Sequence, residues 1–397
     1  MVAEPIGRQD ALRAAGPHAR RRRRVCFLFI AQPHQVLHSL PIALALAHGW
    51  PEIEVEIAAT SQTQLDYVTD LIRRLGAPAL PQRLLGPAWL RGFRPGGASI
   101  PLKVPMLLAN LPVLARYDAI VCPERTTVLI RDLGLRRPAL IYTQHGAGDR
   151  GGTFEPRLRR FDLVMASGPK TYGRTVGPGL AKAEDCAVVG YPKFDIVEAL
   201  KTPPPKLFAQ DRPIVLYNPH FDPALSSWPG EGLKVLDAFA ADPRYNLIFA
   251  PHVRLFDGDH PDRAAVARFE GLPNIHVALS GQAMIDMTYA RMADVYLGDV
   301  SSQVYEFLRV LRPCVFLNGH HVAWQGDEDY RHWLYGPVVE QASDVLNAVD
   351  RSRAEHAARW KAEQQAGFAE TFDLQARTSS ERAAEAIVRR MDRRDAA

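Results

Sequence analysis

Short, uninterrupted apolar runs alternate with longer helical stretches along most of the chain, and this alternation limits the fold more than any other feature. The runs contain few charges, which is typical of parallel strands covered on both faces. Helices are expected at 64–75, 233–240, 264–270 and 284–290. Strands are expected at 24–30, 53–58, 119–122, 139–143, 163–166, 187–190, 214–218, 246–250, 275–277, 295–298 and 314–318. The pattern predicts an α/β protein with two doubly wound sheets.

A proline cluster at 201–206 divides the chain, because it can continue neither a helix nor a central strand. We expect a disordered basic tail at 1–24, a Rossmann-like domain at 25–200, a second one at 201–378 and a C-terminal helix at 379–397. Thr378 and Glu381 have the spacing of a capping box at the start of that helix. Two sheets joined by one linker predict a cleft where the carboxyl ends of their strands face each other.

Composition excludes several classes of protein. The 48 Lys and Arg against 44 Asp and Glu give a net charge of +4, too mild for a dedicated nucleic-acid binder. No apolar run is long enough for a transmembrane helix. The four cysteines show no CxxC spacing, which favours buried thiols over a disulfide framework or a metal site. We therefore expect a cytoplasmic protein, whose five arginines at 20–24 either attract anionic lipid or form a solvated charge run.

His145 directly follows the predicted strand 139–143 and begins a glycine-rich loop with Gly146 and Gly148. A histidine at a strand end suits a general base at neutral pH, although it could instead bond the loop backbone. The loop matches a GxGxxG string, but the strand and helix context of a dinucleotide site is missing. Nicotinamide binding is therefore not expected.

A turn after the predicted strand 295–298 has the features of a phosphate site. Backbone N–H groups and hydroxyls at a helix start attract anions, although a single serine there could be only an N-cap. The expected donor-binding residues of this turn are Gly298, Asp299, Ser301, Ser302 and Glu306.

Further polar residues follow other predicted strands. His252 and Arg254 follow strand 246–250, and His220 follows strand 214–218, so all three should reach the cleft. His34 and His38 follow the first strand and could contact an acceptor, but a metal site would need a third ligand. The DxD string at 257–259 has the composition of a surface turn, and no metal is expected.

The segment 274–318 resembles the CDP-glycerol glycerophosphotransferase family, enzymes of teichoic-acid and capsule polymers with a GT-B fold. The resemblance extends to about 117–318. The matching motifs are Met284–Asp286, Ala293-Asp294, the turn Asp299–Ser302 with Glu306, Arg312-Pro313, His145-Gly146, Pro251-His252 and Gly190–Asp195.

The resemblance implies a GT-B fold and a role for each motif. His145 and His252 are the implied catalytic residues, His145 as the base and His252 on the donor's phosphates. The implied partners are a nucleotide-activated donor and a glycan or lipid-linked hydroxyl acceptor, with no cofactor and no metal. The sequence departs from the family at His220-Phe221-Asp222, where an arginine near the phosphates is lost, and at Gly148 and Arg150.

Three functions remain open from the sequence. The first is transfer of glycerol phosphate or a related group from a CDP-activated donor in cell-surface polymer synthesis. Because of the lost arginine, the alternative is a glycosyltransferase using a UDP- or CMP-sugar, or a UDP-sugar 2-epimerase. The third is a non-enzymatic module at the inner face of the membrane, suggested by 20–24 and the apolar segment 101–115. That segment could equally form a hairpin packed on the first domain.

Overall fold

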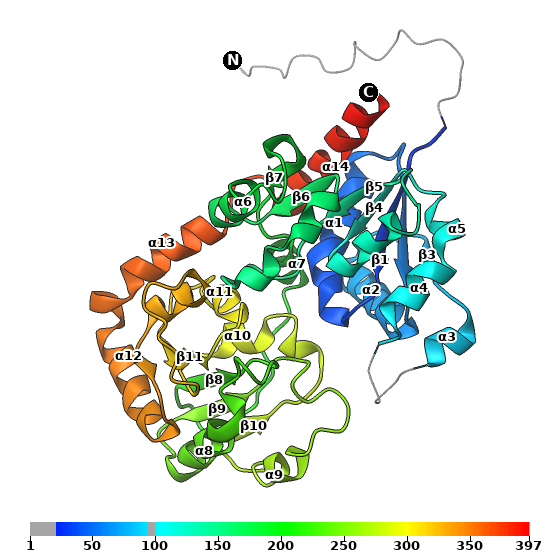
Figure 1. Ribbon diagram of the computed structural model, residues 1–397. Helices are drawn as coiled ribbons and strands as arrows, with labels where there is room; N and C mark the ends of the chain where they lie inside the picture. The colour runs from blue at the N-terminus through cyan, green and yellow to red at the C-terminus, as the bar shows by residue number, and fades with distance from the viewer. Residues whose placement is uncertain (1–20, 94–99, 397) are drawn as a thin grey trace, which may run out of the picture.

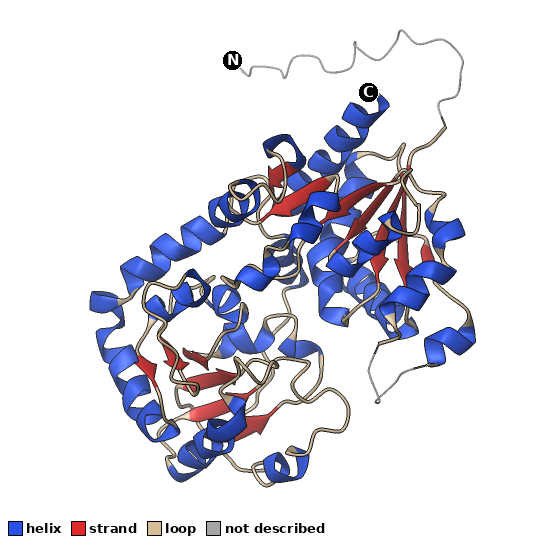
Figure 2. Ribbon diagram, viewed as in Figure 1, coloured by secondary structure: helices blue, strands red, loops and turns tan. Residues whose placement is uncertain are grey.

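A computed structural model describes residues 21–93 and 100–396, which form two α/β domains side by side (Figures 1 and 2). Helices cover both faces of each sheet. Their bounds in the first domain are α1 Val36–Gly49, α2 Gln62–Leu75, α3 Ala88–Gly92, α4 Lys103–Ala109, α5 Leu111–Leu114, α6 Pro169–Val176 and α7 Pro192–Leu200. In the second part of the chain they are α8 Trp228–Ala241, α9 Arg263–Ala267, α10 Thr288–Met292, α11 Gln303–Phe307, α12 Val345–Arg359, α13 Lys361–Thr371 and α14 Ser379–Asp395.

Both sheets are parallel, with their central strands almost fully buried. The first has the order β3-β2-β1-β4-β5-β6-β7, with bounds Gln82–Leu84, Glu54–Ala59, Arg24–Phe29, Ala119–Cys122, Ala139–Tyr142, Leu163–Ala166 and Cys186–Val188. The second has the order β10-β9-β8-β11-β12-β13, with bounds Ile275–Val277, Asn246–Phe249, Ile214–Asn218, Val295–Gly298, Cys314–Leu317 and Val338–Val339. Two doubly wound sheets were predicted, and this is confirmed.

The predicted strands lie within two residues of the observed ones, but two strands were not predicted. β3 and β13 have three and two residues and lie at sheet edges, so neither has a long apolar run. The helix predicted at 284–290 is wrong. A 3-10 turn ends at Met284, Met287 takes a left-handed φ of 65°, and α10 begins only at Thr288. Asp286 Oδ1 accepts from the Thr288 N–H at 3.0 Å, a local bond that competes with a continuous helix.

The C-terminal helix α14 returns to the first domain, where it packs against α1 and α7 (Figure 1). The predicted capping box is present: Thr378 accepts from the Glu381 N–H, and Glu381 bonds back to Thr378. Arg23 pairs with Asp392 and Asp395 near the end of α14, both at 2.5 Å. Helix α14 therefore packs as part of the first domain, although it follows the second sheet in the sequence.

Three other expectations concern the whole chain. Most of the predicted tail lies outside the described residues, but Arg24 already belongs to β1 and Arg21 pairs with Asp118. All four cysteines are buried and free, as expected. Among the described residues, no helix combines the length and hydropathy needed to cross a membrane.

Candidate functional site: a cleft between the two domains

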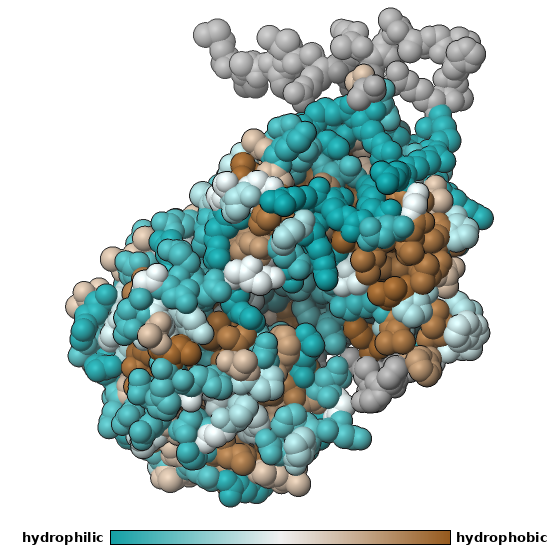
Figure 3. Space-filling model, in the orientation of Figure 1, coloured by the Kyte–Doolittle hydropathy of each residue, from teal (hydrophilic) through white to brown (hydrophobic). Residues whose placement is uncertain are grey.

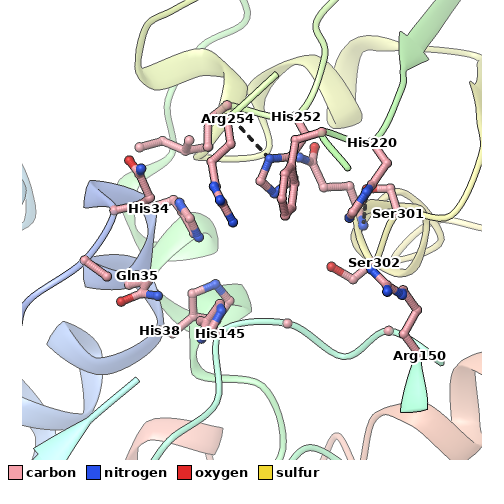
Figure 4. Close-up of a pocket in the computed structure, with 18 of the residues that line it drawn as sticks. His34, Gln35, His38, His145, Arg150, His220, His252, Arg254, Ser301 and Ser302 are labelled. Atoms are coloured by element: carbon pink, nitrogen blue, oxygen red, sulfur yellow. Dashed lines mark hydrogen bonds between the residues drawn. The ribbon is translucent and has the colours of Figure 1, made fainter. Parts of the chain in front are cut away.

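A cavity of about 650 Å³ lies between the carboxyl ends of the two sheets (Figure 4). It brings together polar residues that are far apart in the sequence. The predicted site residues that line it are His34, His38, His145, Gly146, Gly148, His220, His252, Arg254, Ser301, Ser302 and Glu306. Gly298 and Asp299 do not line it.

His145 follows β5 and presents one defined nitrogen to the cavity. Its Nδ1 lies 2.6 Å from the Pro123 carbonyl oxygen. Because a carbonyl only accepts, Nδ1 carries the hydrogen and Nε2 keeps a lone pair. Burial lowers the pKa of His145, and the nearby Glu124 carboxylate opposes this only in part. His145 is therefore neutral at pH 7, with a basic nitrogen available to a hydroxyl.

His220 and His252 have the opposite tautomer. The Asp222 N–H donates to His220 Nδ1 at 3.1 Å. The Arg254 N–H donates to His252 Nδ1 at 3.2 Å (Figure 4). With Nδ1 accepting, Nε2 of each neutral ring carries the hydrogen. Burial lowers the pKa of His252 to about 3 and that of His220 to about 4. The two rings, 5.6 Å apart between centroids, are uncharged hydrogen-bond donors beside His145.

His34 and His38 come from the turn before α1 and from its first turn. The His34 ring lies between His145 and His252, with centroid distances of 6.1 and 6.3 Å. His34 Nδ1 is buried and has no hydrogen-bond partner among the described residues. His38 lies deeper and packs edge-on against Tyr191 at 5.2 Å. Burial lowers the pKa of both histidines.

The two predicted serines have different positions. Ser301 is buried, and its Oγ accepts from the Gln303 N–H at 3.3 Å, a local turn bond just before α11. Ser302 faces the glycine loop of the first domain (Figure 4). A Cβ on Gly148 would lie 3.0 Å from Ser302 Cβ, and one on Gly146 would lie 3.1 Å from Ser302 Oγ. The two domains meet closely here because these positions have no side chain.

Arginines add positive charge to this region. The Arg254 guanidinium lies over the Phe221 ring, 3.9 Å from its centroid, and points into the cavity (Figure 4). Arg150 lines the cavity beside Ser302. Neutral N–H donors and two guanidinium groups around one cavity suit a diphosphate.

Asp299 does not line the cavity but binds backbone groups of a loop that does. It is 1 % exposed and accepts backbone N–H bonds from His220 at 2.9 Å and Ser227 at 2.6 Å. Burial raises its pKa to about 6, although these bonds oppose the shift. Asp299 thus positions the His220 loop without facing the cavity.

Glu306 is held between the domains. Lys193 Nζ donates to both of its oxygens at 2.7 Å, and the Tyr191 hydroxyl donates at 2.8 Å. Asp195, two residues beyond Lys193, accepts from the Ser380 N–H at 2.7 Å at the start of α14. The segment 190–195 therefore connects both domains and the C-terminal helix.

A second buried carboxylate between the domains was not predicted. Asp149 lies in the His145 loop, 2 % exposed, and bonds to Lys170, Tyr305 and His332 at 2.7–2.8 Å. Burial alone would raise its pKa, but His332 and Lys170 hold it well below its usual value. A further ion pair lies at the start of α4, where Lys103 pairs with Glu124 at 2.8 Å and also lines the cavity. A short polar loop gives no periodicity from which such partners could be identified.

Metal binding finds no support in the described residues, where no group of three or more His, Cys, Asp or Glu side chains is placed to hold an ion. The DxD string is a turn, with Gly258 at φ 76°. Asp257 does line the cavity, and Gln32 approaches it at 3.5 Å.

Comparisons with known proteins identify the fold. The sequence matches no protein-family model and no curated protein. Among solved structures, a variant of the wall teichoic acid polymerase TagF soaked with CDPG has a TM-score of 0.62 at 14% identity, over 94% of this chain and 89% of that one. The S. aureus MnaA–UDP structure has a TM-score of 0.62 at 13% identity, over 94% and 97%.

A third similar structure is UDP-GlcNAc 2-epimerase from Neisseria meningitidis bound to UDP-GlcNAc. Its TM-score is 0.60 at 13% identity, over 93% of this chain and 100% of that one. The two parallel-sheet α/β domains match these proteins, so the chain has a GT-B fold. The predicted fold is confirmed. The low identities leave the reaction to be argued from the site.

Proposed function

We propose that this protein is a GT-B enzyme that transfers a group from a nucleotide-activated donor to a hydroxyl acceptor. The observation that carries the proposal is the set of histidine tautomers. His145 Nε2 can only accept a hydrogen bond, whereas Nε2 of His220 and His252 donates. One basic nitrogen beside two neutral donors fits a hydroxyl that loses its proton next to a bound phosphate.

The donor's diphosphate would lie between the His220 and His252 donors and the turn at Ser302, with Arg150 and Arg254 balancing its charge. Structures of TagF soaked with CDPG and of MnaA with UDP support a nucleotide donor for this fold. Of the two donor classes, we favour a CDP-activated polyol phosphate, because the first-domain base and the serine turn match the motifs of that family.

In this reaction His145 Nε2 takes the proton from the acceptor hydroxyl, and the hydroxyl oxygen forms a bond to the donor's β-phosphorus. The bond from that phosphorus to the bridging oxygen breaks, and CMP leaves with the electron pair. The neutral donors of His220 and His252 stabilise charge on the phosphates as the bond breaks. The acceptor is a glycan or lipid-linked hydroxyl of a cell-surface polymer. No step of this proposed reaction uses a metal or a cofactor.

A second candidate is sugar chemistry on a UDP-sugar, either transfer or 2-epimerisation. Its support is that epimerase structures resemble this chain as closely as TagF does. Epimerisation needs a group to remove a proton from carbon. Three of the four acids that line the cleft are held in ion pairs, Glu124 with Lys103, Asp149 with Lys170 and Glu306 with Lys193, and the fourth, Asp257, accepts from Gln32 Nε2 at 3.5 Å. Because these carboxylates are already bonded, they are poorly placed to remove a proton from carbon. This favours transfer, which needs only the histidine base.

His145→Ala tests the proposal. Turnover should fall at least about 100-fold, while the dissociation constant for the nucleotide changes little. His48→Ala, on an exposed position near the end of α1, is the matched control and should remain fully active. A His145→Ala enzyme with normal turnover would show that this histidine is not the base. Formation of an altered UDP-sugar without acceptor would instead establish the epimerase.

A further inference from the structure

One face of the first domain carries exposed apolar side chains on a segment, 71–117, that contains no acidic residue. Eight large apolar residues are exposed in the described part of the chain, and five of them lie on or beside α3 and α4. These five, here called the apolar face, are Trp89, Phe93, Leu102, Val104 and Leu108, exposed by 73, 56, 39, 42 and 46 %. In Figure 3 hydrophobic residues gather over the region that Figure 1 labels α3 to α5.

The helices that carry this face are firmly anchored. Leu90, Met106, Leu107 and Leu114 are buried in the core of the first domain. The Gly86 N–H donates to Asn110 Oδ1 at 2.9 Å, which ties the start of α3 to the end of α4. The segment 101–115, for which a hairpin packed on the first domain was one alternative, does pack on that domain: it forms the two short helices α4 and α5, with one side in the core and the other exposed. Val104 and Leu108, four residues apart, share the exposed side of α4.

The chain segment that carries the apolar face is basic, and the two acids that reach it from other segments are both paired, Glu56 with Arg83 at 2.7 Å and Glu124 with Lys103 at 2.8 Å. No Asp or Glu occurs between Asp70 and Asp118. The described basic residues of this stretch include Arg91 on α3 and the exposed Arg116 after α5. Exposed apolar side chains on a segment whose own charges are all positive fit the surface of an anionic bilayer, where aromatic rings enter the headgroup region and each basic residue adds attraction. A second copy of this face would repel the first.

We infer that this protein docks on anionic membranes through the apolar face, as a peripheral protein. The face lies next to the entrance of the cleft, because Ile100 and Lys103 line the cavity while Leu102 and Val104 are exposed. If the proposed function holds, a lipid-linked acceptor reaches His145 from the bilayer along this edge. The docking itself does not depend on the chemistry in the cleft.

Sedimentation with lipid vesicles tests the inference on the full-length protein. The wild type should bind vesicles containing phosphatidylglycerol much more strongly than vesicles of phosphatidylcholine alone, and added salt should weaken binding. Trp89→Ser/Phe93→Ser should reduce binding at least about tenfold. Arg116→Gln should reduce it a few-fold. The matched control is Leu334→Ser/Leu374→Ser, which changes two exposed apolar residues elsewhere and should bind like the wild type.

Four results would overturn the inference: no binding of the wild type to anionic vesicles, full binding by Trp89→Ser/Phe93→Ser, loss of binding on removal of residues 1–20 alone, or a dimer that this double variant dissociates. Circular dichroism and nucleotide binding of the double variant should match the wild type, which separates lost docking from lost folding. A protein that binds vesicles but no nucleotide would contradict the proposed function and leave the docking intact.

Discussion

Removing one partner of the Lys193–Glu306 ion pair should be strongly destabilising, because the pair is buried between the two domains. The side chains are 6 and 9 % exposed, and Lys193 Nζ lies 2.7 Å from both carboxylate oxygens. Removing one partner of a buried pair leaves an uncompensated charge and costs about 3–5 kcal/mol. We therefore expect Lys193→Met to lower the free energy of unfolding by this amount, since only the Tyr191 hydroxyl would still bond Glu306.

The double variant Lys193→Met/Glu306→Gln separates the pair from its surroundings. It removes both charges but keeps an oxygen that can accept from Tyr191, so its loss should be about 1 kcal/mol. Lys234→Met is the matched control, because Lys234 pairs with Glu231 at 2.6 Å but is 65 % exposed. An exposed pair contributes at most about 1 kcal/mol.

Urea denaturation followed by tryptophan fluorescence measures these differences from the transition midpoints. Lys193→Met should lower the free energy of unfolding much more than the double variant does. The double variant should lower it about as much as Lys234→Met. The reasoning fails if Lys193→Met is no more harmful than Lys234→Met. It also fails if the losses of Lys193→Met and Glu306→Gln simply add in the double variant, because the two side chains would then not interact.

Two other predictions concern the cleft. Gly148→Ala would bring a Cβ to 3.0 Å from Ser302 Cβ, so calorimetry should show nucleotide binding at least about tenfold weaker. Gly152→Ala is the control and should bind nucleotide normally, because no atom lies within 4 Å of its added Cβ. In the folded protein the pKa is about 3 for His252 and about 4 for His220, whereas in the unfolded chain both have a pKa of about 6.5. As the pH falls from 6.5 to 5, these two histidines therefore take up protons only in the unfolded state. Each of these two histidines should lower the free energy of unfolding by about 2 kcal/mol from pH 6.5 to 5, so urea titrations of His252→Gln should show a drop over this range that is smaller than the wild type's by about that amount.

The sequence was sufficient for the sheets, because buried parallel strands are continuous apolar runs such as 119–122 and 295–298. It was insufficient for β3 and β13, which are short edge strands defined by pairing with a neighbour. The break before α10 also escaped prediction. There Asp286 bonds the Thr288 N–H locally, and this competes with the helical periodicity.

For the site, most of the residues predicted from strand ends line the cleft, but the histidine tautomers were not predicted. His145, His220 and His252 were identifiable because parallel strands deliver their carboxyl ends to one edge. Their tautomers depend on the Pro123 carbonyl and on two backbone N–H groups, which no sequence pattern specifies. Whether Glu306 contacts the donor, as the sequence suggested, stays a prediction, and in the structure both of its oxygens bond Lys193.

Calorimetric titration of the wild type with CDP and with UDP tests the central claim most directly, because the proposed chemistry requires a nucleotide diphosphate in this cleft. We predict saturable binding of one of them at one site, weakened at least about tenfold in His252→Gln through loss of a phosphate contact. Stronger binding of CDP would favour polyol-phosphate transfer, and stronger binding of UDP would favour sugar chemistry. Absence of binding to both nucleotides, or equal binding by His252→Gln, would contradict the account.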